Sequence, residues 1–253
     1  MRWIRGWWPV IGAASLLGLT ALVAVAQVAE VKAPSEEPPR YLKGEERTAF
    51  LRKVEKGMGG VQSFAAEFRQ EKVLRLFKTS VKSWGFLLYS RPDSMRWEIR
   101  EPFRSILVVA GQKVGKFEYA EEERRALKLG GGEKAILSVM NQIRSWFGGK
   151  FDAQEDIYDM DVAEQPRPVI VLRPRPNALK KNVQEIRVLL SADLSTIVKV
   201  TLMELKGDRT EMTFQEIRRN LILRDEIFSV TDPAEVDREA LRKAPELTPQ
   251  RGS

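Results

Sequence analysis

The sequence contains no histidine and no cysteine among its 253 residues. The absence of histidine excludes a Ser-His-Asp triad and the ordinary kind of zinc site. The absence of cysteine excludes a thiol nucleophile, a disulfide and a lipidated cysteine at the mature N-terminus. An enzyme would be left with carboxylate chemistry, either a carboxylate-based hydrolase or a carboxylate metal site.

The sequence also lacks a convincing phosphate loop or metal loop. Its glycine clusters, Gly57–Gly60 and Gly130–Gly132, do not follow the G-x-x-x-x-G-K-[ST] order and predict hinges or helix stops. The acids between Asp152 and Asp161 lack the glycine and the ligand spacing of a calcium loop. We interpret that run as an exposed acidic edge. The sequence therefore predicts a protein that is not an enzyme and needs no metal or cofactor.

Charge gives little indication of a nucleic-acid partner. The net charge is +7, but cations are interleaved with acids, as in Glu121–Arg125 and Asp208–Glu211. A nucleic-acid-binding protein usually clusters its cations on one element. We expect a solvated surface with a mild preference for anionic membranes or acidic partners, and no nucleic-acid partner.

The N-terminus has the pattern of a secretory signal peptide. Arg2 and Arg5 precede an uncharged, mostly apolar run, Val10–Ala26, which ends in an A-x-A site at Ala24-Val25-Ala26. This predicts a signal peptide over 1–26, cleavage after Ala26 and location in the periplasm. The alternative is an uncleaved membrane anchor, because the apolar run approaches the length that spans a bilayer.

The rest of the chain is dominated by strand patterns. Residues 27–44, which contain three prolines, predict a linker, and helical spacing predicts a helix from Glu45 to Met58. Period-two alternation then indicates a series of antiparallel strands. We expect strands near Ser63–Arg69, Ser83–Tyr89, Ser94–Arg100, Ser105–Val109, Val114–Tyr119, Val169–Leu172, Val183–Leu190, Thr196–Leu205 and Thr210–Ile217.

One amphipathic helix interrupts the strands. Ile136, Val139, Met140, Ile143, Trp146 and Phe147 recur at helical spacing and form a wide apolar stripe between two glycine clusters. A short terminal helix is predicted from Asp232, with Pro233 at its first position. The predicted fold is mainly β (α+β). It is an incomplete antiparallel barrel or curved sheet over 45–233, followed by a C-terminal helix and loose tail over 234–253.

The aromatic and methionine side chains of the predicted sheet have two possible roles. With the apolar helix they would form either an ordinary core or a cavity for a hydrophobic ligand, with the helix as its lid. Periodicity alone does not decide between these. The residues concerned are Phe64, Phe68, Trp84, Phe86, Leu88, Met95, Trp97, Ile99, Ile136, Met140, Ile143, Trp146, Phe147 and Phe214.

The stretch from Val61 to Gly111 resembles the LolA-type family of periplasmic lipoprotein carriers. The resemblance rests on Val61-Gln62-Ser63-Phe64, Phe68-Arg69-Gln70, Gly85-Phe86-Leu87-Leu88-Tyr89, Arg91-Pro92, Arg96-Trp97-Glu98, Glu101-Pro102 and Ile106–Gly111. The later order of a helix, further strands and Phe228 before Asp232-Pro233 also fits. The resemblance implies a half-barrel with lid helices, an apolar cavity lined by the fourteen residues above, and Arg91 as the latch that holds the lid.

The same resemblance implies a function. It is that of a monomeric carrier of acylated lipoproteins from an inner-membrane lipoprotein-releasing transporter to an outer-membrane receptor. Other envelope lipids, such as glycolipids, would fit the same cavity. The alternative is a membrane-anchored lipid-sensing regulator of the same fold. The sequence names neither the cargo nor the donor and acceptor.

Overall fold

The computed structural model describes residues 39–77, 79–120, 123–176 and 182–247. The predicted signal peptide, 1–26, and most of the predicted linker lie outside these residues. Tyr41 and Leu42, at the end of the predicted linker, pair with Ala163 and Val162 at one edge of the sheet. The folded unit therefore begins a few residues earlier than the sequence indicates. Within the described residues, no helix is both long enough and apolar enough to cross a bilayer.

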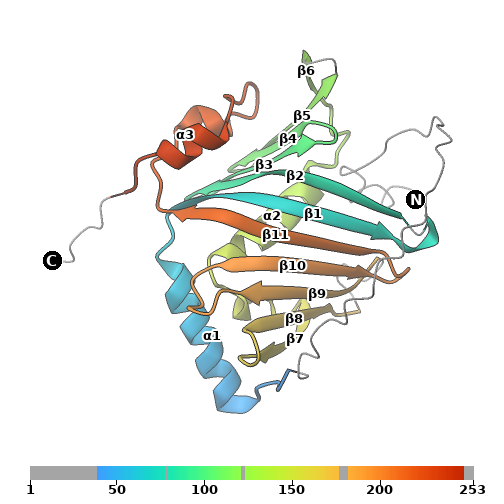
Figure 1. The fold of residues 1–253 in the computed structure, drawn as a ribbon, viewed down its shortest axis with the longest axis vertical. Helices are drawn as coiled ribbons and strands as arrows, with labels where there is room; N and C mark the ends of the chain where they lie inside the picture. The colour runs from blue at the N-terminus through green and yellow to red at the C-terminus, as the bar shows by residue number, and fades with distance from the viewer. Residues whose placement is uncertain (1–38, 78, 121–122, 177–181, 248–253) are drawn as a thin grey trace, which may run out of the picture. The chain divides into compact units, whose positions relative to one another are not determined.

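The fold is built on one open antiparallel sheet of eleven strands (Figure 1). Its spatial order is β6-β5-β4-β3-β2-β1-β11-β10-β9-β8-β7, so the first strand pairs with the last and lies at the centre. The strands are β1 (Ser63–Leu74), β2 (Thr79–Ser90), β3 (Ser94–Glu101), β4 (Ser105–Ala110), β5 (Lys113–Ala120), β6 (Glu123–Ala126), β7 (Tyr158–Ala163), β8 (Val169–Pro174), β9 (Val183–Leu190), β10 (Ile197–Glu204) and β11 (Arg209–Arg219).

Two α-helices pack on one face of this sheet, which we call the inner face. α1 (Gly44–Gly59) precedes β1, and α2 (Glu133–Phe147) joins edge strand β6 to edge strand β7. α2 therefore passes from one end of the strand order to the other, and it is seen behind the sheet in Figure 1. The left-handed Gly149 (φ 75°) ends α2 against α1, where an added Cβ would lie 3.0 Å from the carbonyl oxygen of Val54.

The opposite face, which we call the outer face, is covered by the C-terminal segment, Leu221–Leu247. This segment contains the 3₁₀ turn η4 (Asp225–Phe228) and α3 (Arg238–Lys243). Its side chains enter a buried cluster with residues from β1, β2, β4 and β5. The members of the cluster are Ala65, Phe86, Leu88, Ile106, Val108, Phe117, Leu221, Ile227, Phe228 and Val236. The sheet therefore has apolar packing on both faces.

Charged groups tie the C-terminal segment to the sheet. Arg96 and Glu98 are fully buried and form an ion pair of 2.6 Å. The Arg96 guanidinium also donates to the carbonyls of Ile227 (3.0 Å) and Ala234 (2.6 Å), while Arg100 donates to the carbonyl of Val236. Burial lowers the pKa of Arg96, and the adjacent Glu98 carboxylate offsets part of that effect. Backbone carbonyls that would otherwise be buried without a partner are thus satisfied by two arginines.

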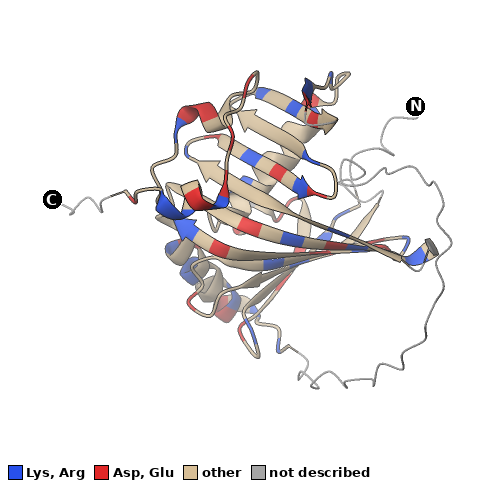
Figure 2. Cartoon of the chain, turned by 45° about the horizontal axis from the view of Figure 1, so that its top comes forward, with Lys and Arg blue, Asp and Glu red and all other residues tan. Residues whose placement is uncertain are grey.

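The structure differs from the sequence-based expectation at three elements. β6 and β7 were not predicted, and the last helix begins at Arg238 rather than at Asp232. The N-cap is Asp237, whose carboxylate accepts a hydrogen bond from the Ala240 amide at 2.7 Å. Lys and Arg alternate with Asp and Glu along the strands and over the C-terminal segment, as Figure 2 shows.

Candidate functional site

Strand register decides which side chains share the inner face. Phe64 pairs with Tyr89, Tyr89 pairs with Met95, and Leu87 pairs with Trp97. Side chains of paired residues point to the same side of a sheet, and successive residues alternate. Phe64, Phe68, Leu87, Tyr89, Met95, Trp97, Ile99 and Phe214 therefore lie together on the inner face, drawn from four adjacent strands.

α2 covers this aromatic floor through its apolar stripe. Phe147 stacks on Phe64 with ring centroids 4.6 Å apart and meets Phe214 edge-on at 5.5 Å. Ile136 and Met140 are buried on the same helix, and Ile143 is half-buried. The side chains of α2 thus fill the space above the floor.

Trp146 takes a different direction from Phe147. Its indole nitrogen donates to Gln154 Oε1 at 2.8 Å, and its ring stacks near Phe151, 6.5 Å between centroids. Tyr158 of β7 lies at a similar distance, and burial raises the pKa of its hydroxyl to about 12. Trp146 therefore anchors the end of α2 to the segment that leads into β7.

The structure does not bring Trp84, Phe86 and Leu88 to the inner face. Leu88 pairs with Ala65 and Arg96, and Phe86 pairs with Glu67 and Glu98. Phe86 and Leu88 belong to the outer cluster, and Trp84 packs against it. The expectation that these three residues line the same cavity as Phe64 is therefore wrong. β2 is apolar on both faces, so its alternation could not show which set points inward; Leu87 and Tyr89 do.

Arg91 lies beside the ends of both covering helices. It follows β2, and its guanidinium donates to the carbonyl of Gly59, the last residue of α1, at 2.9 Å. That carbonyl has no partner within its helix. Arg144, in the last turn of α2, donates to the carbonyl of Pro92 in the same turn at 3.3 Å. Both helices are therefore tied to one exposed turn by single guanidinium contacts.

The electrostatics at this turn favour a neutral Tyr89. Burial raises the pKa of the Tyr89 hydroxyl, and the positive charges of Arg91 and Arg144 oppose that rise. Tyr89 also lies against Phe64, with ring centroids 5.6 Å apart. Tyr89 thus connects the aromatic floor to the arginines that hold the helices, a link that the sequence pattern did not single out.

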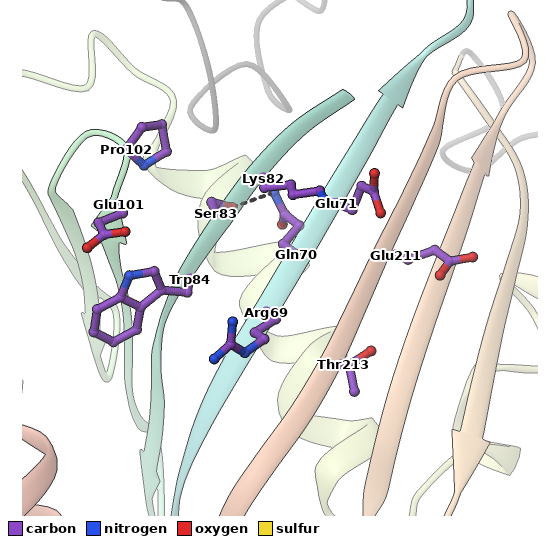
Figure 3. A pocket seen from close by; sticks show the side chains of 10 residues that line it. All are labelled: Arg69, Gln70, Glu71, Lys82, Ser83, Trp84, Glu101, Pro102, Glu211 and Thr213. Carbon is purple, nitrogen blue, oxygen red and sulfur yellow. Dashed lines mark hydrogen bonds between the residues drawn. The ribbon is translucent and has the colours of Figure 1, made fainter. Parts of the chain in front are cut away.

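A polar groove of about 720 Å³ runs along β1, β2 and β11 (Figure 3). It is lined by charged side chains of these strands, by Trp84, Glu101, Pro102 and Thr213, and by Gln70 and Ser83. Acids and bases alternate around it, among them Arg69, Glu71, Lys82 and Glu211. In the described part of the chain, no three His, Cys, Asp or Glu side chains gather as metal ligands would.

Comparison with known proteins identifies the family. The family model described as "Outer membrane lipoprotein carrier protein LolA" matches residues 59–231, more than half of the chain. The chain belongs to the LolA family. The match covers every strand of the sheet and the turn that carries Arg91.

Named relatives agree with this family at low identity. The chain is 24% identical over 185 residues to an outer-membrane lipoprotein carrier protein of Legionella pneumophila (strain Lens), covering 71% of this chain and 84% of the relative. It is 24% identical to the protein of that name from Dechloromonas aromatica, covering 70% and 80%. Among solved structures, a LolA superfamily protein of Nitrosomonas europaea aligns at 9% identity and a TM-score of 0.36, covering 72% and 96%.

Proposed function

We propose that this protein is a periplasmic, non-enzymatic carrier that shelters the acyl chains of lipoproteins on its inner face. The observation that carries the proposal is the aromatic floor around Phe64, Phe68 and Phe214, closed by α2 in a chain of the LolA family. In the proposal, Met95, Trp97 and Ile99 extend the same floor, and Ile136, Met140, Ile143 and Phe147 form the underside of the lid.

The physics of the task requires shelter and no catalytic group. Each methylene removed from water contributes about 0.8 kcal/mol, so a sixteen-carbon chain is worth on the order of 12 kcal/mol. A lipoprotein with free acyl chains therefore stays in a membrane or aggregates. A continuous apolar surface of the carrier offsets this term and lets the lipoprotein cross the aqueous space between two membranes.

Cargo entry requires α2 to move away from the sheet. Phe147 occupies the space between Phe64 and Phe214, so an acyl chain can lie there only after that ring leaves. The contacts that tie the helices to the Arg91–Pro92 turn are few and solvent-accessible. We infer that, on binding, the acyl chains replace the side chains of α2 against the aromatic floor. On release, α2 returns and the arginine contacts reform.

The partners follow from this role. An inner-membrane lipoprotein-releasing transporter would load the carrier, and an outer-membrane receptor would unload it. The carrier would act as a monomer. It would be exported to the periplasm by its signal peptide, which would be cleaved after Ala26. Mass spectrometry of the exported protein should find Gln27 as its first residue; full-length chain recovered in washed membranes would instead favour the anchored form.

Carrier activity can be tested with two vesicle populations separated by a membrane that passes protein but not vesicles. Donor vesicles contain a fluorescent diacylated lipopeptide, and the same peptide without acyl chains is the control. We expect the protein to increase transfer of the acylated peptide to acceptor vesicles at least tenfold. Transfer that is unchanged by the protein, or protein-bound peptide that never reaches the acceptor, would contradict the carrier role.

A further inference from the structure

A buried polar pair lies on the inner side of β1 and β2 and borders the polar groove of Figure 3. Gln70 of β1 and Ser83 of β2 are paired in register, and their side chains are only 3% and 7% exposed. Gln70 Nε2 donates to Ser83 Oγ at 3.2 Å, the contact drawn as a dashed line in Figure 3. On its other side Gln70 is paired with Met212, which is also buried.

The Gln70 amide is only half satisfied. Its oxygen, Oε1, is buried and has no hydrogen-bond partner. Turning the amide by 180° would place the oxygen at Ser83 and leave the nitrogen unpaired instead. In either orientation one strong polar group is buried without a partner, which folded proteins rarely tolerate because it costs stability. The site therefore has hydrogen-bonding capacity that the closed protein leaves unused.

A second unpaired group lies on the same face. The indole nitrogen of Trp97, Nε1, is buried and also lacks a partner. The Trp97 ring lies 5.2 Å from the ring of Phe68, between centroids, and Phe68 precedes Gln70 by two residues on the same side of β1. An unpaired indole N–H thus lies beside Phe68, and a half-satisfied amide lies two residues further along the same side of β1.

We propose that Gln70, Ser83 and Trp97 form a recognition site for the carbonyl group that joins an acyl chain to its cargo. The Trp97 N–H would donate to the carbonyl oxygen of an ester or amide. The Gln70 amide, turned so that its oxygen accepts from the Ser83 hydroxyl, would donate to the same carbonyl through Nε2. A bare hydrocarbon chain could use neither group. The inference rests on the proposed lipid-binding function and adds that the inner face distinguishes an acyl chain from a simple alkyl chain.

The test compares two lipids that differ only at the linkage. Dioctanoyl phosphatidylglycerol contains two ester carbonyls, whereas its dioctyl ether analogue has the same headgroup and nearly the same chains without them. Affinities for the purified protein are measured by isothermal titration below the micelle concentration. We expect the wild type to prefer the ester lipid by roughly three- to tenfold, the size of one or two net hydrogen bonds.

Two variants and two matched controls locate the preference. Trp97→Phe and Gln70→Met should each bring the affinity ratio towards one, because the ester affinity falls more than the ether affinity. Circular dichroism shows whether each variant is folded. Trp84→Phe and Gln215→Met change the same residue types on the outer face and should keep the wild-type ratio. Because Gln70→Met removes the unpaired amide, it should be at least as resistant to urea as the wild type.

Each other outcome overturns a defined part of the argument. Equal binding of both lipids by the wild type would remove the recognition site and leave the lipid-binding function standing. A preference that survives in Trp97→Phe and Gln70→Met would also remove it. Failure of the wild type to bind either lipid would contradict the proposed function together with this inference.

Discussion

Arg91 shows how one side chain could control access to the inner face. Its guanidinium reaches the last carbonyl of α1, and Arg144 ties α2 to the adjoining Pro92. A hydrogen bond to a charged group is worth about 1.5–3 kcal/mol, which is small beside the burial of an acyl chain. It is still large enough to change the balance between closed and open forms by tenfold or more.

Arg91→Leu should keep the fold and take up acylated peptide, but it should pass the peptide to acceptor vesicles at least tenfold more slowly. When cargo leaves, the protein loses its packing against the acyl chains. In the wild type, the hydrogen bond from Arg91 to the Gly59 carbonyl reforms and offsets part of that loss. The leucine variant cannot make this bond, so release is less favourable. Arg125→Leu is the matched control, because this exposed arginine lies on edge strand β6. Transfer by Arg91→Leu at the wild-type rate would exclude the latch role.

Asp193 provides a residue-scale prediction about pH. Hydrogen bonds from the hydroxyls of Ser191 and Ser195 lower the pKa of this carboxyl from 3.8 to about 2. Because the folded pKa lies below the unfolded value, the carboxylate stabilises the protein above about pH 4, and this contribution disappears as the pH falls towards 2. Urea titrations should show Asp193→Asn less stable than wild type at neutral pH and equal to it near pH 2. A difference that is independent of pH would be inconsistent with this account.

At the scale of elements, the C-terminal segment depends on buried charge. Glu98 is fully buried and contacts Arg96, Arg100 and Arg104, and the arginines in turn bind carbonyls or acids of the segment. Glycine at position 115 of β5 lets the backbone of the C-terminal segment approach the sheet closely, since an added Cβ would lie 2.3 Å from the Val230 carbonyl oxygen. The segment is therefore an integral layer of the fold rather than a tail.

Glu98→Gln should lower the free energy of unfolding by about 3–5 kcal/mol, because it leaves buried guanidinium charge without its counterion. The matched control is Arg173→Met, which removes a half-exposed pair with Asp161 and Glu185 and should cost less than about 1 kcal/mol. Urea unfolding followed by circular dichroism measures both. Equal effects for the two variants would mean that the buried cluster is not what holds the segment.

The helix α2 provides a test of opening. Because the chain has no cysteine, two introduced cysteines are its only sites for thiol-reactive spin labels. With labels at the exposed positions Asn141 of α2 and Gln184 of β9, the distance between the labels should increase when a diacylated peptide is added. The same peptide without acyl chains should leave it unchanged. Acyl-dependent binding without any change in distance would show that α2 does not act as the lid.

The sequence predicted elements well where one face is apolar, and less well elsewhere. The stripe from Ile136 to Phe147 identified α2 because its period leaves no alternative to a helix. β7 was not predicted because its period of two is short and its alternate residues, Asp159 and Asp161, are carboxylates, which are rare in strands. The acids lie on an edge strand and pair with Arg175 and Arg173, which agrees with the expected acidic edge.

At the scale of the molecule, the sequence could not show which apolar side chains point to the inner face of the sheet and which to the outer face. Trp84, Phe86 and Leu88 alternate as regularly as Phe64, Ala66 and Phe68, yet they point to the other side of the sheet. Only the pairing register between β1 and β2 distinguishes the sets. The second apolar layer exists because the C-terminal segment returns across the outer face, an arrangement that no local pattern reveals.

The two apolar faces allow a direct test of where cargo binds. A photoreactive benzoylphenylalanine is placed at Phe64, Phe68 or Phe214 on the inner face, and at Phe86 or Phe117 in the outer cluster as matched controls. Each protein is irradiated with a diacylated peptide, and cross-linked product is measured by mass spectrometry. We expect acyl-dependent cross-links from the inner positions and none from the outer ones. Cross-links of equal yield from Phe86, or their absence at all three inner positions, would contradict the assignment of the inner face as the lipid-binding site.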